Sequence, residues 1–133
     1  MAALSSRSKY TAIFIAMAVI LCLALLPSKT TSSTVKSLER ARQICSACRA
    51  YAAHNGGNFP PSLDTLFPTY LTDRIILTSP LKPDEPAGYL YTPGLKSIGA
   101  TDTVAVEDKF APALQHVRIV AYLDGSARVL PLQ

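Results

Sequence analysis

Two cysteines and a histidine are the side chains with the most evident capacity for chemistry in this chain. The stretch ICSACRAYAAHNGG places Cys45 and Cys48 three positions apart, and His54 follows shortly after. With the second histidine, His116, they supply enough ligands for a tetrahedral zinc site, and Cys-x-x-Cys is also the pattern of a thiol redox centre. The spacing fits neither site well. The interval from Cys48 to His54 lies outside the common zinc-finger spacings, and a redox pair normally opens a helix.

The two cysteines are better explained as part of a helix face. Apolar and small residues recur at intervals of three and four: Val35, Leu38, Ala41, Cys45, Cys48 and Ala52. This period predicts an amphipathic helix over residues 33–55, which Asn55 or Gly56 closes in the left-handed conformation. Both thiols then lie on the inward stripe, where free cysteine behaves as a small hydrophobe. The sequence favours packing or a structural disulfide over metal or redox chemistry.

Other motifs that carry chemistry are absent from the sequence. It contains no Gly-rich phosphate loop, no G-x-S-x-G elbow and no H-E-x-x-H pair. Asp102, Glu107 and Asp108 are calcium-ligand types that lie close together in sequence, but they lack the ligand rhythm of an EF-hand, so loop solubility is the favoured explanation. The sequence therefore predicts no catalytic residue, no cofactor and no metal site, and the chain is not predicted to be an enzyme.

A basic segment, residues 1–9, precedes an apolar run. The 17 residues from Tyr10 to Leu26, YTAIFIAMAVILCLALL, contain no charged residue, and about 17 is the shortest length that spans a bilayer. The sequence that follows, PSKTTSST, does not provide the small-x-small pattern of a signal-peptidase site, so residues 10–26 are predicted to be a retained transmembrane helix. Basic residues flank both ends and do not fix the orientation. The short N-terminal segment favours a single-pass inner-membrane protein with residues 27–133 exported as a head.

The net charge of +4 is concentrated near this predicted anchor. Residues 27–49 carry five basic side chains and one acidic side chain, whereas residues 50–133 carry six basic and eight acidic ones. A basic stretch beside a membrane can meet anionic lipid or nucleic acid. No aromatic residues are interleaved with these charges, so a solvated helix face is preferred and nucleic acid is disfavoured.

The remainder of the chain reads as turns and short strands. PSKTTSST (27–34) is a polar break, which the sequence leaves open as a loop or as a weak point in a longer helix. FPPSLDTLFPTYL predicts a short helical turn with Leu63, Leu66 and Phe67 inward, and YLYT and TVAVE predict two strands. HVRIVAYLDGSARVL predicts a β-hairpin over residues 117–130, with a two-residue type I′ turn at Asp124 and Gly125. The predicted fold is α+β: a long N-terminal helix, membrane-spanning in its first half and amphipathic in its second, packed on a small antiparallel sheet.

This order of elements resembles the type IV pilin and type II secretion pseudopilin superfamily, and the likeness covers most of the chain. Three stretches are similar to parts of small bacterial pseudopilin-like proteins. The helix end and the YPxxLxxL turn correspond to CRAYAAHNGGNFPPSLDTLFPTYL, and the Pro-rich loop and Y-x-Y strand correspond to SPLKPDEPAGYLYTPGL. The closing DGS hairpin corresponds to HVRIVAYLDGSARVL. The resemblance implies a membrane-anchored structural protein, accessory to a secretion or type IV pilus apparatus. Its expected partners are membrane lipid and other pilin-like subunits or secretion components.

The chain departs from this family at the processing motif. Prepilins are cut after a Gly that precedes Phe-Thr-Leu-Ile-Glu; here Lys9 replaces the Gly, Tyr10 the Phe and Phe14 the Glu, whereas Thr11 and Ile13 match. The degenerate motif predicts an uncleaved anchor that does not polymerise in the usual way. Two alternatives stay open: an anchored periplasmic binding module that has lost filament assembly, and a zinc or thiol protein that uses the two cysteines.

Overall fold

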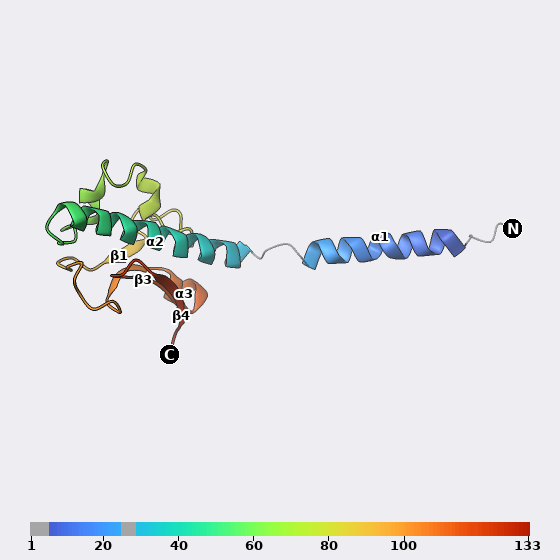
Figure 1. The fold of residues 1–133 in the computed structure, drawn as a ribbon. Helices are drawn as coiled ribbons and strands as arrows, with labels where there is room; N and C mark the ends of the chain where they lie inside the picture. The colour runs from blue at the N-terminus through green and yellow to red at the C-terminus, as the bar shows by residue number, and fades with distance from the viewer. Residues whose placement is uncertain (1–5, 25–28) are drawn as a thin grey trace.

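The computed structural model describes residues 6–24 and 29–133 (Figure 1). Its helices are α1 (Ser6–Ala24), α2 (Lys29–His54) and α3 (Ala111–Gln115), with two single 3₁₀ turns, η1 (Leu63–Leu66) and η2 (Arg74–Leu77). Its strands are β1 (Tyr89–Tyr91), β2 (Val104–Asp108), β3 (Val117–Tyr122) and β4 (Ala127–Pro131). The strands form one antiparallel sheet in the order β1-β2-β3-β4, with α2 packed along it. The predicted α+β class with an antiparallel sheet is confirmed.

The structure does not show the predicted single long N-terminal helix. Helix α1 ends at Ala24 and α2 begins at Lys29, while residues 25–28, with the end of the predicted span, lie outside the described residues, as do residues 1–5 of the basic segment. Of the two alternatives for the polar segment 27–34, the structure shows helix from Lys29 onward, because Ser and Thr lower helix propensity only slightly and no Gly or Pro interrupts the backbone ladder there. Among the described residues, no helix meets the length and hydropathy needed to cross a bilayer.

Helix α2 lies close to the sheet because its inward face is made of small side chains. Ala41, Cys45, Cys48 and Ala52 are fully buried, with the larger Ile44 between them. They pack with Leu66 of η1 and with the sheet residues that face α2. The helix ends as predicted: Gly56 has φ 66°, and the Gly57 amide donates to the Ala52 carbonyl at 2.7 Å.

The pairing register separates two faces of the sheet. Tyr89 lies opposite Asp108 and Tyr91 opposite Val106, whereas Leu90 lies opposite Glu107. Since successive side chains of a strand point to opposite faces, the two tyrosines share the α2 side with Asp108. Leu90 and Glu107 lie on the other face, where Leu90 is exposed. Neighbouring residues of β2 therefore stand in opposite environments.

The β3–β4 hairpin has a different turn from the predicted one. A type I′ turn needs positive φ at both central residues, but Gly125 has φ 88° and Asp124 is not among the positive-φ residues. The Gly125 amide donates to the Tyr122 carbonyl at 2.9 Å, and the Tyr122 amide donates to the Ser126 carbonyl at 2.8 Å. This pattern is a type I turn followed by a left-handed glycine bulge. Asp124 stabilises the turn by accepting from the Ser126 amide and hydroxyl at 2.8 and 2.6 Å.

We expect Gly125→Val to destabilise the head by about 1–3 kcal/mol, because a β-branched residue resists positive φ and its Cβ meets Arg49. A Cβ at Gly125 lies 2.7 Å from Nη1 of Arg49, the atom that donates to the Asp124 carbonyl. Gly94→Val is the matched control, since Gly94 has φ 79° and open space around a Cβ. Urea unfolding followed by circular dichroism measures both. Equal losses would show that the Arg49 contact adds nothing to backbone strain.

Candidate functional site

Helix α1 presents an apolar surface around the predicted processing motif. Tyr10, Ile13 and Phe14 are exposed, Phe14 to 71%, and so are the larger apolar residues of the next two turns. In Figure 1 the helix extends away from the head. Lys9 and Thr11 belong to the same helix, so the motif residues lie on regular helical backbone. The exposed ring of Phe14 suits an apolar environment better than water.

A buried carboxylate, which the sequence analysis assigned to a soluble loop, connects α2 to the rest of the head. Asp108, the last residue of β2, is 0% exposed. It accepts a short hydrogen bond from the Ser37 hydroxyl of α2 and a second one, at 2.6 Å, from the Ser79 hydroxyl. The carboxylate therefore joins three segments that are far apart in sequence: the start of α2, the loop after η2 and the end of β2.

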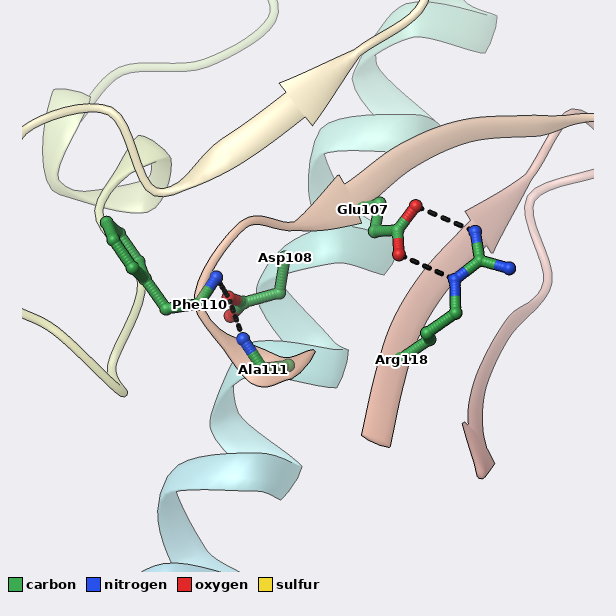
Figure 2. Close-up of polar contacts among 5 residues, drawn as sticks. All are labelled: Glu107, Asp108, Phe110, Ala111 and Arg118. Carbon is green, nitrogen blue, oxygen red and sulfur yellow. Dashed lines mark hydrogen bonds and ion pairs between the residues drawn. The ribbon is translucent and has the colours of Figure 1, made fainter. Parts of the chain in front are cut away.

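The same carboxylate organises the start of α3. Its Oδ1 accepts from the backbone amides of Phe110 at 2.7 Å and Ala111 at 3.1 Å, as Figure 2 shows. These two amides belong to the N-cap residue and the first residue of the helix, where donors have no partner within the helix itself. All four donors to Asp108 are hydroxyls or amides rather than cations. Buried carboxyl oxygens need donors of this kind, because an unpaired polar group in the interior is costly.

Tyr89 completes this buried cluster from β1. Its hydroxyl lies 3.0 Å from the Ser37 hydroxyl and donates to the Ser37 carbonyl at 3.3 Å. Burial raises the pKa of the Tyr89 hydroxyl from 10.0 to about 12. The ring therefore stays neutral beside the Asp108 carboxylate across the physiological range.

Glu107, the neighbour of Asp108, points to the opposite face of the sheet. Its two carboxylate oxygens accept from Nε and Nη2 of Arg118 on β3 at 2.7 and 2.8 Å (Figure 2). The paired carboxylate raises the pKa of Arg118. Loop solubility was therefore the wrong explanation for both residues: one is a buried anchor and the other a cross-strand ion pair. Asp102 lies elsewhere, beside a small surface hollow that Asp124 also lines.

Two arginines of the basic stretch hold α2 to other parts of the head. Nη1 of Arg40 donates to the Thr78 carbonyl at 2.5 Å and to the Ile75 carbonyl at 3.2 Å. Nη1 of Arg49 donates to the Asp124 carbonyl at 2.7 Å. The prediction of a solvated helix face is therefore incomplete. Lys36, Arg42 and Arg49 are exposed, but Arg40 and Arg49 also bind backbone carbonyls.

Cys45 and Cys48 lie in the interface between α2 and the sheet. Both are free thiols and fully buried, and the Cys45 thiol donates to the Tyr122 carbonyl at 3.0 Å. Burial raises the pKa of Cys45 from 9.0 to about 11 and that of Cys48 to about 12. A nucleophilic or metal-binding thiol needs the opposite shift, toward the thiolate. These two positions suit packing.

The two histidines stand apart from the cysteines. His54 ends α2, where its Nδ1 lies 3.0 Å from the Tyr70 hydroxyl. His116 follows α3 with φ 54° and is exposed. In the part of the chain that the structure describes, no three His, Cys, Asp or Glu side chains gather as a metal site would require. The zinc alternative has no geometry here to support it.

We expect the stability contributed by the two buried thiols to disappear at alkaline pH. Their pKa values are raised from 9.0 to about 11 and about 12, so the folded state holds protons that the unfolded state loses. This contribution is fully present below pH 9.0 and is lost as the pH rises toward the raised values. Urea midpoints recorded across this range should fall less steeply for Cys45→Ala/Cys48→Ala than for the natural chain.

The same double variant should cost about 1–3 kcal/mol of stability at neutral pH through lost burial. The buried tyrosines also favour the protonated state, so some alkaline loss remains in the variant. Equal pH slopes in the two proteins would contradict the thiol contribution. Zinc that copurifies in equimolar amount and is lost in the variant would contradict the packing role.

The buried Asp108 cluster was missed because its members are scattered over more than half of the head sequence. A local signal existed nonetheless: in DKFAPALQ, an aspartate precedes a proline that falls in the first turn of a helix, which is a helix-start pattern. No family model, curated protein or solved structure compared with this chain matches it. The functional conclusion therefore depends on the chemistry of these residues and on the resemblance described above.

Proposed function

We propose that this chain is a membrane-anchored structural protein with a pseudopilin-like fold, accessory to a secretion or type IV pilus apparatus. Residues 10–26 form its single transmembrane anchor, continuing into α2, and the head is exported from the inner membrane. The observation that supports this best is the combination of an α1 whose described apolar side chains are exposed with a head whose core is formed by α2 and an antiparallel sheet. An apolar helix of this kind is stable where lipid or other helices cover it.

The head has the properties of a rigid module carried by the anchor. Asp108, Arg40 and Arg49 tie α2 to β2, to the loop after η2 and to the hairpin turn respectively. Because α2 is attached to the rest of the head at three points along its length, the head keeps a fixed orientation relative to α2. This arrangement suits a structural subunit that contacts neighbouring proteins, and it uses no catalytic group.

Membrane fractionation tests the proposal. The natural chain should stay with membranes after an alkaline carbonate wash, and protease added to spheroplasts should digest the head. Ile13→Arg/Met17→Arg, which places two charges in the apolar run, should move the chain to the soluble fraction. Ile98→Arg is the matched control, because Ile98 is 95% exposed in the head. A natural chain found in the soluble fraction would overturn the anchor, and protection of the head in spheroplasts would overturn its export.

The apparatus is identified by copurification. Chemical crosslinking in cells followed by affinity purification should recover pilin-like subunits or secretion components with the full chain. Recovery of a small-molecule or peptide ligand without any such component would favour the anchored binding module. A hollow of about 370 Å³ between α2 and the segment that leads into η2, lined by Arg40, Gln43, Tyr70 and Asp73 among others, is one place where such a ligand would fit.

A further inference from the structure

The large hydrophobic residues exposed on the head are unevenly distributed. Seven such side chains are exposed among the described residues of the head, and four of them lie on the first part of α2, on α3, and on or just after β4, elements that the contacts below bring together. These four are Val35, Leu114, Val129 and Leu132. A scattered exposed leucine needs no explanation, but a concentration at one end indicates a contact surface.

Several contacts place these residues at the same end. Ser37, two residues after Val35, is hydrogen-bonded to Asp108, which in turn holds the start of α3 and thereby Leu114. Strand β3 begins directly after α3. Pro131 at the end of β4 pairs with Val117, the first residue of β3, and Val129 pairs with Ile119. Figure 1 shows α3, β4 and the C-terminus below α2, on the side of the head that is nearer to α1.

Aromatic and basic side chains accompany this apolar set. Phe110 precedes α3, and the Nζ atoms of Lys82 and Lys109 lie 5.1 and 5.4 Å from its ring centre. Lys36, one residue from Val35, is exposed. Apolar and aromatic side chains mixed with lysines fit the interface of a membrane, where acyl chains meet anionic headgroups. We call Val35, Leu114, Val129, Leu132, Phe110, Lys36, Lys82 and Lys109 the base of the head.

Chain length keeps the base near the anchor. The five steps from Ala24 to Lys29 reach at most about 19 Å, at about 3.8 Å each. If α1 crosses the bilayer, the start of α2 cannot leave the surface of that bilayer by more than this distance. This limit keeps the base at a high effective concentration of lipid headgroups, so weak individual contacts suffice for docking.

We propose that the base of the head docks on the anionic phospholipid headgroups that surround its own anchor. This inference rests on the proposed anchor role of residues 10–26. Val35, Leu114, Val129 and Leu132 enter the interface, while Lys36 and Lys109 meet lipid phosphates. Docking holds the head upright at the membrane, with the loop that contains Ile98 at the far end. That loop is placed there by the Asn58–Lys96 bridge, beyond the end of α2.

Tryptophan fluorescence in vesicles tests the proposal, since the natural chain contains no tryptophan. Full-length Leu114→Trp and Leu132→Trp proteins are reconstituted in phosphatidylcholine–phosphatidylglycerol vesicles that carry a headgroup spin label as quencher. Ile98→Trp is the matched control at the far end of the head. We expect blue-shifted, strongly quenched emission at the first two positions and water-like, weakly quenched emission at the third. Equal quenching at all three positions would overturn the docking.

Two further measurements separate the alternatives. Vesicle flotation reports the anchor itself: a chain that floats but shows no preferential quenching overturns docking alone, whereas a chain that does not float overturns the anchor. Lys36→Glu/Lys109→Glu in the Leu114→Trp background should reduce quenching and leave flotation unchanged. A blue shift that persists in lipid-free detergent and grows with protein concentration would assign the base to a second copy of the chain and overturn the lipid contact.

Discussion

Asp108→Ala should destabilise the head by about 3–5 kcal/mol, because it leaves buried hydroxyls and amides without their acceptor. The four donors come from Ser37, Ser79, Phe110 and Ala111, so one substitution loosens α2, the loop after η2 and α3 together. A loss of this size is a large share of the total stability of a small domain, about 5–15 kcal/mol. Urea unfolding of the detergent-purified chain, followed by circular dichroism, measures it.

Glu107→Ala is the matched control, because Glu107 is the adjacent residue of the same strand on the opposite face. Its ion pair with Arg118 is partly exposed, 19% and 42% for the two side chains, and we expect a loss of about 1 kcal/mol. Asp108→Asn keeps the shape of the side chain but removes its capacity for charge. Its loss of stability should fall between those of the two alanine variants, since the amide oxygen still accepts hydrogen bonds. Similar losses at positions 107 and 108 would contradict the anchoring role of Asp108.

The local features of the fold were predictable because their causes are local. The period of apolar residues along α2, the glycines after His54 and the Asp-Gly pair of the hairpin each act within a few residues. Even so, the hairpin turn was assigned the wrong type. Asp-Gly is compatible both with a type I′ turn and with a type I turn that ends in a glycine bulge, and the closing bond between Tyr122 and Ser126 decides between them.

The buried cluster illustrates what single-sequence reasoning cannot supply. Ser37 and Asp108 are 71 positions apart, and neither residue type is normally expected inside a protein. Their burial follows from how β2 lies under α2, which depends on packing over the whole head. Alternation along β2 does predict that Glu107 and Asp108 face opposite sides, but it does not say which side is covered.

The natural chain should retain Arg7 and Lys9 when its mass is measured after extraction from membranes. By resemblance, prepilin peptidase needs a small residue before the cut, and Lys9 is long and charged. In assembling pilins the glutamate at the position of Phe14 pairs with the terminal amine of a neighbouring subunit. An unpaired carboxylate in apolar surroundings costs several kcal/mol, at least about 2.5 kcal/mol in the middle of a membrane helix. Phe14, which is exposed on α1, removes both this cost and the pairing that sets the register of subunits.

Restoring the motif provides the test of this reasoning. Lys9→Gly/Phe14→Glu, coexpressed with a prepilin peptidase, should yield a shorter chain that begins at Tyr10, whereas the natural chain keeps its full length beside the same enzyme. Lys9→Gly alone should restore cleavage without restoring assembly, because the acidic partner of the terminal amine is still absent. Intact-mass spectrometry distinguishes the products. A natural chain with a mature N-terminus at Tyr10, methylated on its amine, would refute the uncleaved anchor.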